Sequence, residues 1–537
     1  MSIPFLSDQN YDLKSAKVSF IGNGYIGMDV VKDRQILLAL NDSKGFTIST
    51  SFYPLVELEM NSVAKQSAHV LSDFNEGNSK AIFCTVVENK CVCANHQIYM
   101  HRTRPNVLVQ EIRFSNPSGS ALDFTFSHSQ PSGWDKQESG SAPVYLRTFD
   151  ENARVMVAIM CSSVPSMQFT VKPRREEVFR FSCVLQHEIM LPTSDVSSTK
   201  LRLARMVRQQ FSDLNGLLAN DLDKEHKDAW RKLNEAAFNI SFSKAPNALN
   251  ADMVNLTKYA LLSNVRAPLV EVGTEAATRA IYETRLEKTE LCYSGHSTML
   301  TPSKLWQSWG SLRDLLKTIE IWLMTLEHRG CMNLVHAGAH GVAEAFLLSL
   351  TAATFTHHRL EITLDPADLH RHIRVENLRI GQTKLSLMFD LDSSYRTNVK
   401  LWSTGSPLYA CSAGCVESPS SIGGSPVQLA IKITKPPTPI LFISTEKLKL
   451  EQLKDTLHVI GVEDAPAHDS ETIALHKHGQ NTGLPTIFWV VLIFMLVAFH
   501  LFLFKLIYSE WKNSSNIPYT KLTKKMLLKR NSDFRDH

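Results

Sequence analysis

The sequence lacks several signatures that would assign it to a common functional class. No Cys-x-x-Cys pair occurs, so the cysteine spacing does not support a zinc site. No basic stretch is interleaved with aromatic residues and the formal net charge is only +4, so we expect no nucleic-acid partner. We find no internal repeat and no low-complexity tract. A charged content of 20% with a hydrophobic content of 44% is typical of a globular protein, not of a disordered one.

The N-terminus also lacks an apolar segment that would direct a chain into the secretory pathway. The opening stretch, MSIPFLSDQNYDLKSAK, contains no such core. Near the other end, however, the 19 residues Thr486–Phe504 carry no formal charge. A helix rises about 1.5 Å per residue, so this run spans close to the roughly 30 Å hydrocarbon core of a bilayer. We therefore predict one transmembrane helix over residues 485–508.

The charges that flank this run predict its orientation. The 33 residues after it hold eight lysines and arginines against three acidic residues. The 34 residues before it, 451–484, hold two basic residues and six acidic ones. Because basic flanks stay in the cytosol, we expect a cytosolic tail and a large lumenal part, a type I arrangement. This arrangement requires a signal, so we expect an incomplete N-terminus; the alternative is a tail-anchored cytosolic adaptor.

A lumenal location predicts disulfides and glycans. Nine cysteines precede the apolar run, and an odd number leaves at least one of them free. We expect Cys411 to pair with Cys415 in the short loop YACSAGC, and Cys292 with Cys331 as the next pair. Three Asn-x-Ser/Thr sites become usable on that side of the membrane: Asn41, Asn239 and Asn255.

Hydrophobic periodicity changes twice along the chain and predicts an α+β fold. Short alternating runs separated by Gly, Pro, Ser and Asn indicate an N-terminal antiparallel β-sandwich over residues 1–195. Apolar residues at spacings of three and four indicate a helical region over 196–354. Alternating runs return as a C-terminal β-sheet domain over 355–460. A polar stalk over 461–484, the transmembrane helix and a cytosolic tail over 509–537 complete the prediction.

We predict no catalytic residue, and the candidates for such a role are one group of glutamates. Glycoside cleavage uses two carboxyl groups that face each other across the bond. Glutamates cluster between 271 and 290, and Glu283 and Glu287 lie one helical turn apart. The simpler interpretation is a solvated helix face, because arginines and lysines alternate with these glutamates.

Other motifs favour structural roles. The spacing of His336, His340 and Glu344 fits one helix face, but the glycines beside them indicate a turn, so we predict no metal. The loop Tyr293–Ser297 has Ser and His without the glycines of a nucleophile elbow. The Gly-x-Gly-x-x-Gly pattern at Gly22–Gly27 is followed by strand-like sequence, so we expect close backbone contacts there and no dinucleotide cofactor. In the tail, Tyr519 and Leu522 form a Tyr-x-x-bulky sorting signal.

The chain resembles an uncharacterised family of single-pass type I membrane proteins known by a large-cDNA (KIAA-series) label. The resemblance extends over nearly the whole chain. It implies a hydrophobic N-terminal segment, which this sequence lacks, and no established activity. The segments that carry it are GNGYIGMDV (22–30), LCYSGHSTMLTPSKLW (291–306), HRGC (328–331), YACSAGC (409–415), PILFISTEKLKLEQLKDTLH (439–458) and HLFLFKLIYSEW (500–511).

A second, partial resemblance is to glycoside hydrolase family 65, the disaccharide phosphorylase and acid trehalase group. The pentapeptide Asn23–Gly27 is similar to that family's NGYLG motif, and Ala339–Gly341 is similar to its Gly-His-Gly turn. The resemblance implies the order sandwich, helical α/α barrel and sheet. The helical region here is too short for a complete ring, and no residue matches the family's catalytic glutamate.

These observations lead us to expect a type I membrane glycoprotein of the secretory pathway, in the endoplasmic reticulum, the Golgi or at the cell surface. Its lumenal body is expected to be glycosidase-like but not catalytic, and to bind a carbohydrate or a protein. We expect no cofactor. The alternatives are an active carbohydrate-cleaving membrane enzyme and the tail-anchored adaptor.

Overall fold

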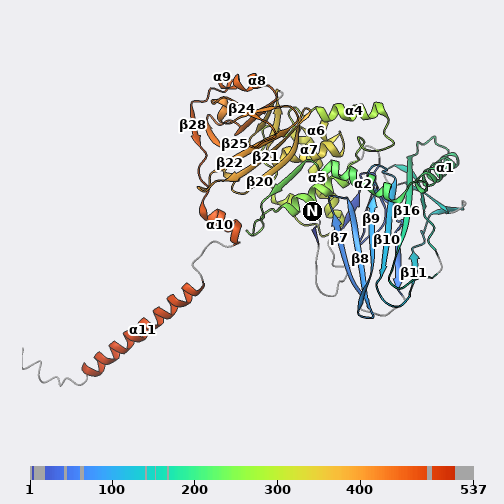
Figure 1. Cartoon of the computed structure of the whole chain (residues 1–537), viewed down its shortest axis with the longest axis horizontal. Coiled ribbons are helices and arrows are strands. Elements are labelled where there is room, and N and C mark those ends of the chain that lie inside the picture. Colours follow the sequence, from blue (N-terminus) through green and yellow to red (C-terminus); the bar gives the residue numbers. More distant parts are fainter. Residues whose placement is uncertain are drawn as a thin grey trace, which may run out of the picture. The chain divides into compact units, whose positions relative to one another are not determined.

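The computed structural model describes residues 3–4, 19–40, 45–60, 66–138, 142–150, 153–165, 168–357, 359–479 and 486–514. They belong to two compact units (Figure 1). The larger unit comprises residues up to 243 together with 247–469, and the smaller comprises 244–246 with the chain from 470 onward.

The N-terminal part of the larger unit is built on a nine-stranded antiparallel sheet. Its long central strands lie side by side in Figure 1. In sheet order the strands are β1 (Ile3–Pro4), β7 (Gln66–Asp73), β8 (Asn78–Val87), β9 (Lys90–Met100), β10 (Val107–Asn116), β16 (Arg175–Ile189), β14 (Arg154–Cys161), β13 (Val144–Asp150) and β12 (Asp135–Gln137).

Both faces of this sheet are covered where consecutive residues are buried, as in Val155–Met160 of β14, because successive side chains point to opposite faces. One face packs against two small sheets, through clusters that include Ile98 and Val157 with Ile26, and Phe114 with Phe124. The other face packs against helix α1 (Val196–Asn215) through Val207 and Phe211. The small sheets consist of β2 (Phe20–Gly22), β3 (Ile26–Asp29), β4 (Leu37–Leu38) and β5 (Ile48–Ser49), and of β6 (Val56–Met60), β11 (Leu122–His128) and β15 (Phe169–Val171).

The helical region surrounds one fully buried helix, α7 (Ala339–Leu350). Eight of its residues are alanine, valine, leucine or phenylalanine, and almost all of its side chains are buried. It contacts helices on several sides, as expected for a helix that is apolar all round. The other helices are α2 (Ala219–Asn234), α3 (Ala251–Ser263), α4 (Ala276–Glu287), α5 (Leu312–Leu326) and α6 (Met332–Val335).

The C-terminal part contains two five-stranded antiparallel sheets that share one hydrophobic core with the helices. The first consists of β17 (Ala237–Ile240), β20 (Ile373–Ile380), β21 (Thr383–Leu391), β22 (Thr397–Thr404) and β25 (Val427–Ala430). The second consists of β18 (Ala353–Thr356), β19 (Arg359–Ile362), β27 (Leu441–Ser444), β23 (Leu408–Cys411) and β24 (Ser420–Ile422). Strands β26 (Lys432–Lys435) and β28 (Gly461–Asp464) pair with each other. Helix α8 (Lys447–Glu451) packs on β23 and β27, and α9 (Leu453–Leu457) contacts the turn Ala413–Cys415.

The predicted α+β class is confirmed, but the chain crosses the predicted boundaries. Helix α1, predicted to belong to the helical region, instead covers the N-terminal sheet. Its apolar stripe packs against the apolar side chains on one face of that sheet. Strand β17 lies in the helical stretch of the sequence yet pairs with β20. The first residues of the predicted stalk form β28, and Ala465 is buried in the main core. Residues 461–464 are polar because they form the edge strand β28, which has few side chains to bury.

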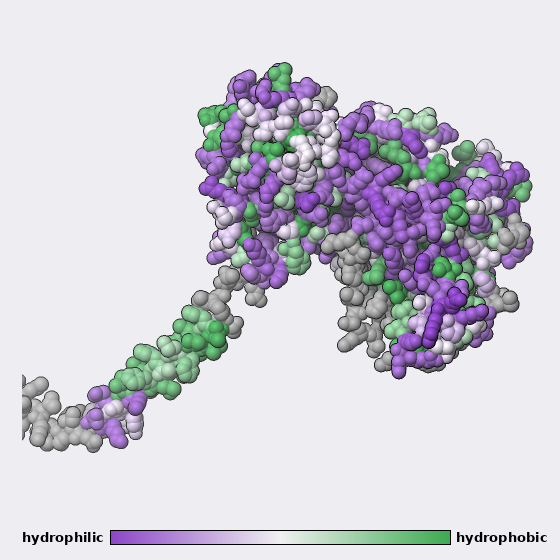
Figure 2. All heavy atoms as spheres, in the orientation of Figure 1, coloured by the Kyte–Doolittle hydropathy of each residue, from purple (hydrophilic) through white to green (hydrophobic). Residues whose placement is uncertain are grey.

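The smaller unit contains α10 (Ser470–His478) and α11 (Thr486–Ser514). Within α11, the candidate span Ile487–Asn513 contains an 18-residue window with a mean hydropathy of 2.8, and none of this window is buried. Among the described residues it is the one helix long and apolar enough to cross a bilayer. Figure 2 shows its apolar surface and the mainly hydrophilic surface of the larger unit. The expected apolar helix is therefore present.

One charged side chain departs from the apolar character of α7. Glu344 is only 6% exposed, and its Oε1 has no hydrogen-bond partner among the described residues. Burial raises its pKa to about 7, against the opposing positive charge of Arg379. One turn earlier, burial lowers the pKa of His340 to about 4, and the charges of Arg102, Arg379 and Lys232 add to this while Glu235 opposes it.

We predict that Glu344 makes the folded state less stable as the pH rises. Its folded pKa lies above its unfolded value, so its full contribution is present below about pH 4.5 and is lost as the pH rises through about 7. The loss is of the order of 3 kcal/mol at about 1.4 kcal/mol per pKa unit. His340 acts in the opposite sense, lowering stability as the pH falls from about 6.5 to about 4.

The variant Glu344→Gln should therefore lose the decline in stability between about pH 5 and pH 8, measured by urea unfolding across that range. Glu320→Gln, an exposed glutamate on α5, is the matched control and should keep the decline. An unchanged pH profile in Glu344→Gln would contradict this interpretation.

Candidate functional site

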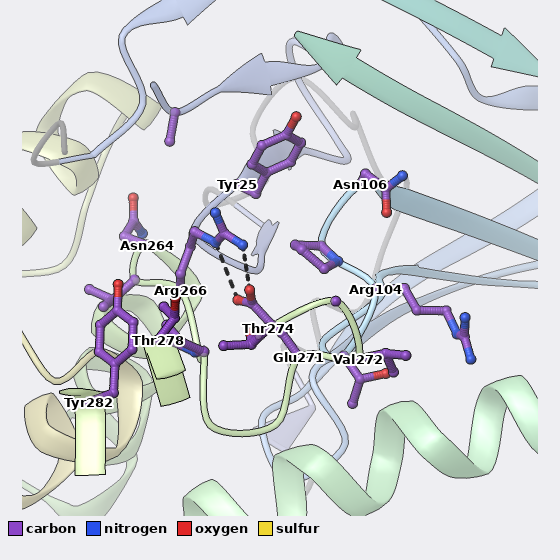
Figure 3. Close-up of a pocket in the computed structure, with 18 of the residues that line it drawn as sticks. Tyr25, Arg104, Asn106, Asn264, Arg266, Glu271, Val272, Thr274, Thr278 and Tyr282 are labelled. Carbon is purple, nitrogen blue, oxygen red and sulfur yellow. Dashed lines mark hydrogen bonds and ion pairs between the residues drawn. The ribbon is translucent and has the colours of Figure 1, made fainter. Parts of the chain in front are cut away.

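The larger unit contains an open cleft of about 1190 Å³ between its N-terminal β part and its helices (Figure 3). This volume exceeds the roughly 300–1,000 Å³ typical of a small-molecule site, so the cleft suits an extended ligand. Its walls come from the β2–β3 turn, the loop after β9, the end of α1, the loop between α3 and α4, and one face of α4. Polar lining residues are Tyr25, Arg104, Asn106, Gln186, His187, Gln210, Asp213, Asn264, Arg266, Glu271, Thr274, Glu275, Thr278, Tyr282, Arg285, Glu327 and His336.

An ion pair organises the loop between α3 and α4. Glu271 is only 2% exposed, and both of its carboxylate oxygens accept hydrogen bonds from the Arg266 guanidinium (Figure 3). The backbone N–H of Ala267 also donates to Glu271 Oε1, at 3.0 Å. The Arg266 side chain remains 41% exposed, so the pair has one buried end and one end in the cleft. Glu271 is thus placed to hold the loop and not to exchange a proton with a ligand.

The turn between β2 and β3 positions this loop from the other side. The Asn23 side-chain N–H₂ donates to the carbonyls of His101 and Pro105, at 2.9 and 2.8 Å. Its oxygen accepts from the backbone N–H groups of Tyr25 and Ile26. Gly24 has φ +82° and donates its N–H to the carbonyl of Ser263. A Cβ on Gly24 would lie 2.2 Å from the backbone N of Arg266. The glycines of this motif thus serve a close backbone approach, as the sequence predicted.

Two tyrosines in the cleft are stacked with arginines. The Arg266 guanidinium lies 5.6 Å from the ring centre of Tyr25, and that of Arg285 lies 5.7 Å from the ring of Tyr282. These are cation–π distances, which orient each ring and each guanidinium. The Tyr282 ring is half-buried on the cleft side of α4.

The hydroxyl of Tyr25 reaches a histidine whose charge is suppressed. Its oxygen lies 2.8 Å from His187 Nδ1, and the tautomer decides which group donates. Burial lowers the pKa of His187 to about 4, and the positive charge of Arg266 adds to the effect. Burial raises the pKa of Tyr25. Both groups are therefore neutral at physiological pH.

The carboxylates of the cleft are either paired or solvated. Glu327 pairs with His336 Nε2 at 3.3 Å, as Glu271 does with Arg266. Asp213 and Glu275 are exposed. Amide groups complete the lining: Asn106 and Gln186 both donate to Gln210 Oε1, at 2.7 and 2.8 Å. The cleft therefore offers hydrogen-bond donors, acceptors and aromatic faces, with little unbalanced charge.

The candidate glutamates Glu283 and Glu287 do not line this cleft. Both are exposed on α4, because Thr278, Tyr282 and Arg285 occupy the helix face that faces the cleft. Of the same sequence cluster, Glu271 and Glu275 do reach it. Glu283 and Glu287 thus lie one turn apart on an exposed part of α4, outside the cleft.

The cysteines form four disulfides. Cys292–Cys331 and Cys411–Cys415 are the two pairs named from the sequence. The sequence did not identify Cys84–Cys93 and Cys161–Cys183, which join neighbouring strands of the nine-stranded sheet. Strand register, which decides these pairs, is not readable from cysteine spacing alone.

The remaining predicted sites fall in different places. Asn239 is exposed on β17, and Asn255 is half-buried on α3 with its sequon partner Thr257 buried.

His336 lies before the start of α7 and apart from His340 and Glu344, and the described residues contain no cluster that could hold a metal ion. Tyr293 is buried and donates to the carbonyl of Ser297, which fits a structural loop. Asn41, Tyr519 and Leu522 lie outside the described residues.

Most residues that line the cleft could not be predicted from the sequence. Arg104, Asn106, Gln210, Arg266 and Tyr282 come from four separate elements, and no spacing rule connects them. One signal was present: the turn Asn23–Gly24–Tyr25 combines a side chain that bonds backbone, a glycine and an aromatic residue.

Comparisons with known proteins identify relatives but no activity. Residues 8–524 match the family described as uncharacterized conserved protein (DUF2152). An "Uncharacterized protein KIAA2013 homolog" from Xenopus tropicalis is 30% identical over 515 residues, 92% of this chain and 82% of that protein. The homolog from Xenopus laevis is 29% identical over 522 residues, 93% and 84% of the two chains.

Among solved structures, one named "Putative kojibiose phosphorylase from human microbiome" matches with a TM-score of 0.38 and 11% identity. The match covers 68% of this chain and 63% of that chain. A likeness of this size supports no conclusion about chemistry.

We predict that Gly24→Ala destabilises the protein by about 2–4 kcal/mol, because a methyl group there overlaps the backbone of Val265 and Arg266 and the φ is positive. Gly273→Ala is the matched control: it lies in the same cleft, has no atom within 4 Å of the added Cβ, and should change stability by less than about 0.5 kcal/mol. Urea unfolding of both variants measures the difference. Equal effects of the two substitutions would contradict the assigned role of Gly24.

Proposed function

Because this chain belongs to the family of uncharacterized conserved proteins DUF2152, we propose its function from its own cleft: it is a membrane-anchored, lumenal carbohydrate-binding protein that does not cleave its ligand. The observation that carries the proposal is the lining of the cleft. It combines stacked tyrosines, amides and arginines, while its buried carboxylate Glu271 is paired with Arg266 and its half-buried carboxylate Glu327 contacts His336.

The membrane anchor is α11, with the large part of the chain in the lumen. The excess of basic residues after the helix and of acidic residues before it supports this orientation. Four disulfides support an oxidising compartment, since such bonds are rare in the cytosol. The protein is then a single-pass type I glycoprotein of the secretory pathway.

A carbohydrate fits the chemistry of the cleft better than an apolar or strongly charged ligand. A sugar ring carries hydroxyl groups at its edge, which donate and accept hydrogen bonds, and C–H groups on its faces, which pack on aromatic rings. Tyr282 supplies an accessible ring, and Asn106, Gln186 and Gln210 supply both donors and acceptors. The size of the cleft favours an oligosaccharide over a single sugar.

Binding without cleavage follows from the state of the carboxylates. Cleavage needs one carboxyl that can give a proton and a second group opposite it. Both oxygens of Glu271 accept from Arg266, and Glu327 is paired with His336. Glu283 and Glu287 are exposed and do not line the cleft.

We predict that the full-length protein in detergent binds oligosaccharides on a glycan array and releases no product from them. Tyr282→Ala should weaken binding of the best glycan about tenfold, roughly 1.4 kcal/mol, because it removes a ring that packs on the sugar. Tyr53→Ala, an exposed tyrosine outside the cleft, is the control and should bind as wild type. Product release, detected by chromatography, would instead show an enzyme, and equal binding by Tyr282→Ala would exclude this cleft.

The lumenal orientation gives a separate prediction. In native membranes, enzymatic removal of N-glycans should increase the gel mobility of the protein, and the combined variant Asn41→Gln, Asn239→Gln, Asn255→Gln should lose this shift. Asn513→Gln removes the sequon at the end of α11 and should leave the shift intact. A wild-type protein without glycans, with its tail protected from added protease, would show the opposite orientation.

A further inference from the structure

Three of the nine cysteines lie on one β-hairpin. Strands β8 and β9 are joined by a two-residue turn, Glu88–Asn89, in which both residues have positive φ. This tight turn fixes the register, since Val87 then lies opposite Lys90. Counting back along the ladder, Cys84 lies opposite Cys93, and the two form a disulfide.

The third cysteine, Cys91, lies on the same face of this hairpin. Side chains alternate between faces along a strand, and Val92 and Ala94 are fully buried in the sheet's core face. Cys91 and Cys93 therefore share the opposite face, which α1 covers farther along the sheet. All nine cysteines are described by the structure, and Cys91 is the one that remains a free thiol; it is exposed. Its cross-strand neighbour Val86 is 54% exposed, so this end of the hairpin is open to solvent.

The geometry places the thiol close to the disulfide. The Cα atoms of Cys84 and Cys93 are 4.2 Å apart, which is typical of a pair that exchanges no backbone hydrogen bonds. Val86 and Cys91 form the next pair of that type along the ladder. Diagonal neighbours across such pairs have Cα atoms about 7–8 Å apart, with side chains closer. The right-handed twist of a hairpin brings the diagonal Cys84–Cys91 together, and Cys91 lies two residues after the turn.

We propose that Cys84, Cys91 and Cys93 form a thiol–disulfide exchange site. The Cys91 thiolate attacks Cys84 Sγ, a Cys84–Cys91 bond forms, and the Cys84–Cys93 bond breaks. Cys93 leaves as a thiolate and takes up the proton that Cys91 gave up. The number of disulfides is unchanged, so the step needs no oxidant or reductant. The free thiol alternates between positions 91 and 93.

The site takes disulfide compounds as its substrates. Whichever cysteine is free attacks one sulfur of the external disulfide, forms a mixed disulfide with it, and releases the other half as a thiolate. This chemistry uses neither the cleft nor its residues. The sheet also offers an internal reference: Cys161–Cys183 joins neighbouring strands in the same directly opposed way, but neither β14 nor β16 has a further cysteine.

The wild-type full-length protein tests the exchange directly. After incubation with glutathione disulfide in mildly alkaline buffer and acid quenching, peptide mapping should find glutathione on Cys91 in some molecules and on Cys93 in others. The variant Cys91→Ser should take up none. Glutathione on Cys91 alone, with Cys84–Cys93 intact in every molecule, would overturn the proposal.

Counting free thiols in two variants tests the reach of Cys91. In Cys93→Ser, Cys84 loses its partner, and we expect Cys84 and Cys91 to join and leave no free thiol. In Cys183→Ser, the matched control, Cys161 has no nearby cysteine, so two free thiols, Cys161 and Cys91, should remain. Two free thiols in a folded Cys93→Ser protein would show that Cys91 does not reach Cys84.

Discussion

The close contact between the Gly24 turn and the loop 263–266 is the constraint on which the cleft depends. A residue with a side chain at position 24 would occupy the space of the Arg266 backbone. From the opposite direction, Gly338, with φ +80°, lies so close that a Cβ would be 2.8 Å from the Arg266 carbonyl oxygen, and Ala339 donates its N–H to the same oxygen. Two glycines more than 300 residues apart thus hold one loop between them. Because that loop carries Arg266, the same contact sets the ion pair with Glu271 and the stacking on Tyr25.

This arrangement explains why the cleft is polar but nearly balanced in charge. A buried carboxylate next to a guanidinium is tolerable because each compensates the desolvation of the other. The same ion pair that allows Glu271 to be buried therefore also occupies its oxygens. Glu344 shows the alternative outcome: without a close partner, the buried carboxyl has a pKa raised to about 7. In this protein, partner geometry and not the number of glutamates decides what each carboxyl can do.

The parts of the fold that depend on local pattern could be predicted from the sequence, and the parts that depend on pairing could not. The periodicity after Ser197 predicted α1, and the uncharged run predicted α11, because both signals lie within one segment. Strand β17 is four residues long and lies between two helices, so its partner strand, more than 130 residues later, left no local trace. Glu283 and Glu287 showed the correct helical spacing, but spacing does not tell which face of a helix is buried. The cleft combines side chains from distant elements, and only the Asn23–Gly24–Tyr25 turn carried a signal of its own.

The position of β17 has a consequence for the order in which the chain folds during synthesis. This strand is made early, but the strand with which it pairs in the described part of the chain, β20, begins at residue 373. At about 5–20 residues per second, the ribosome needs on the order of ten seconds to produce that partner. During this time the unpaired backbone of β17 is an open edge that other chains can join. The pairing of β17 with β20 thus delays completion of this sheet until the chain has been made past residue 380, and it leaves the edge of β17 open until then.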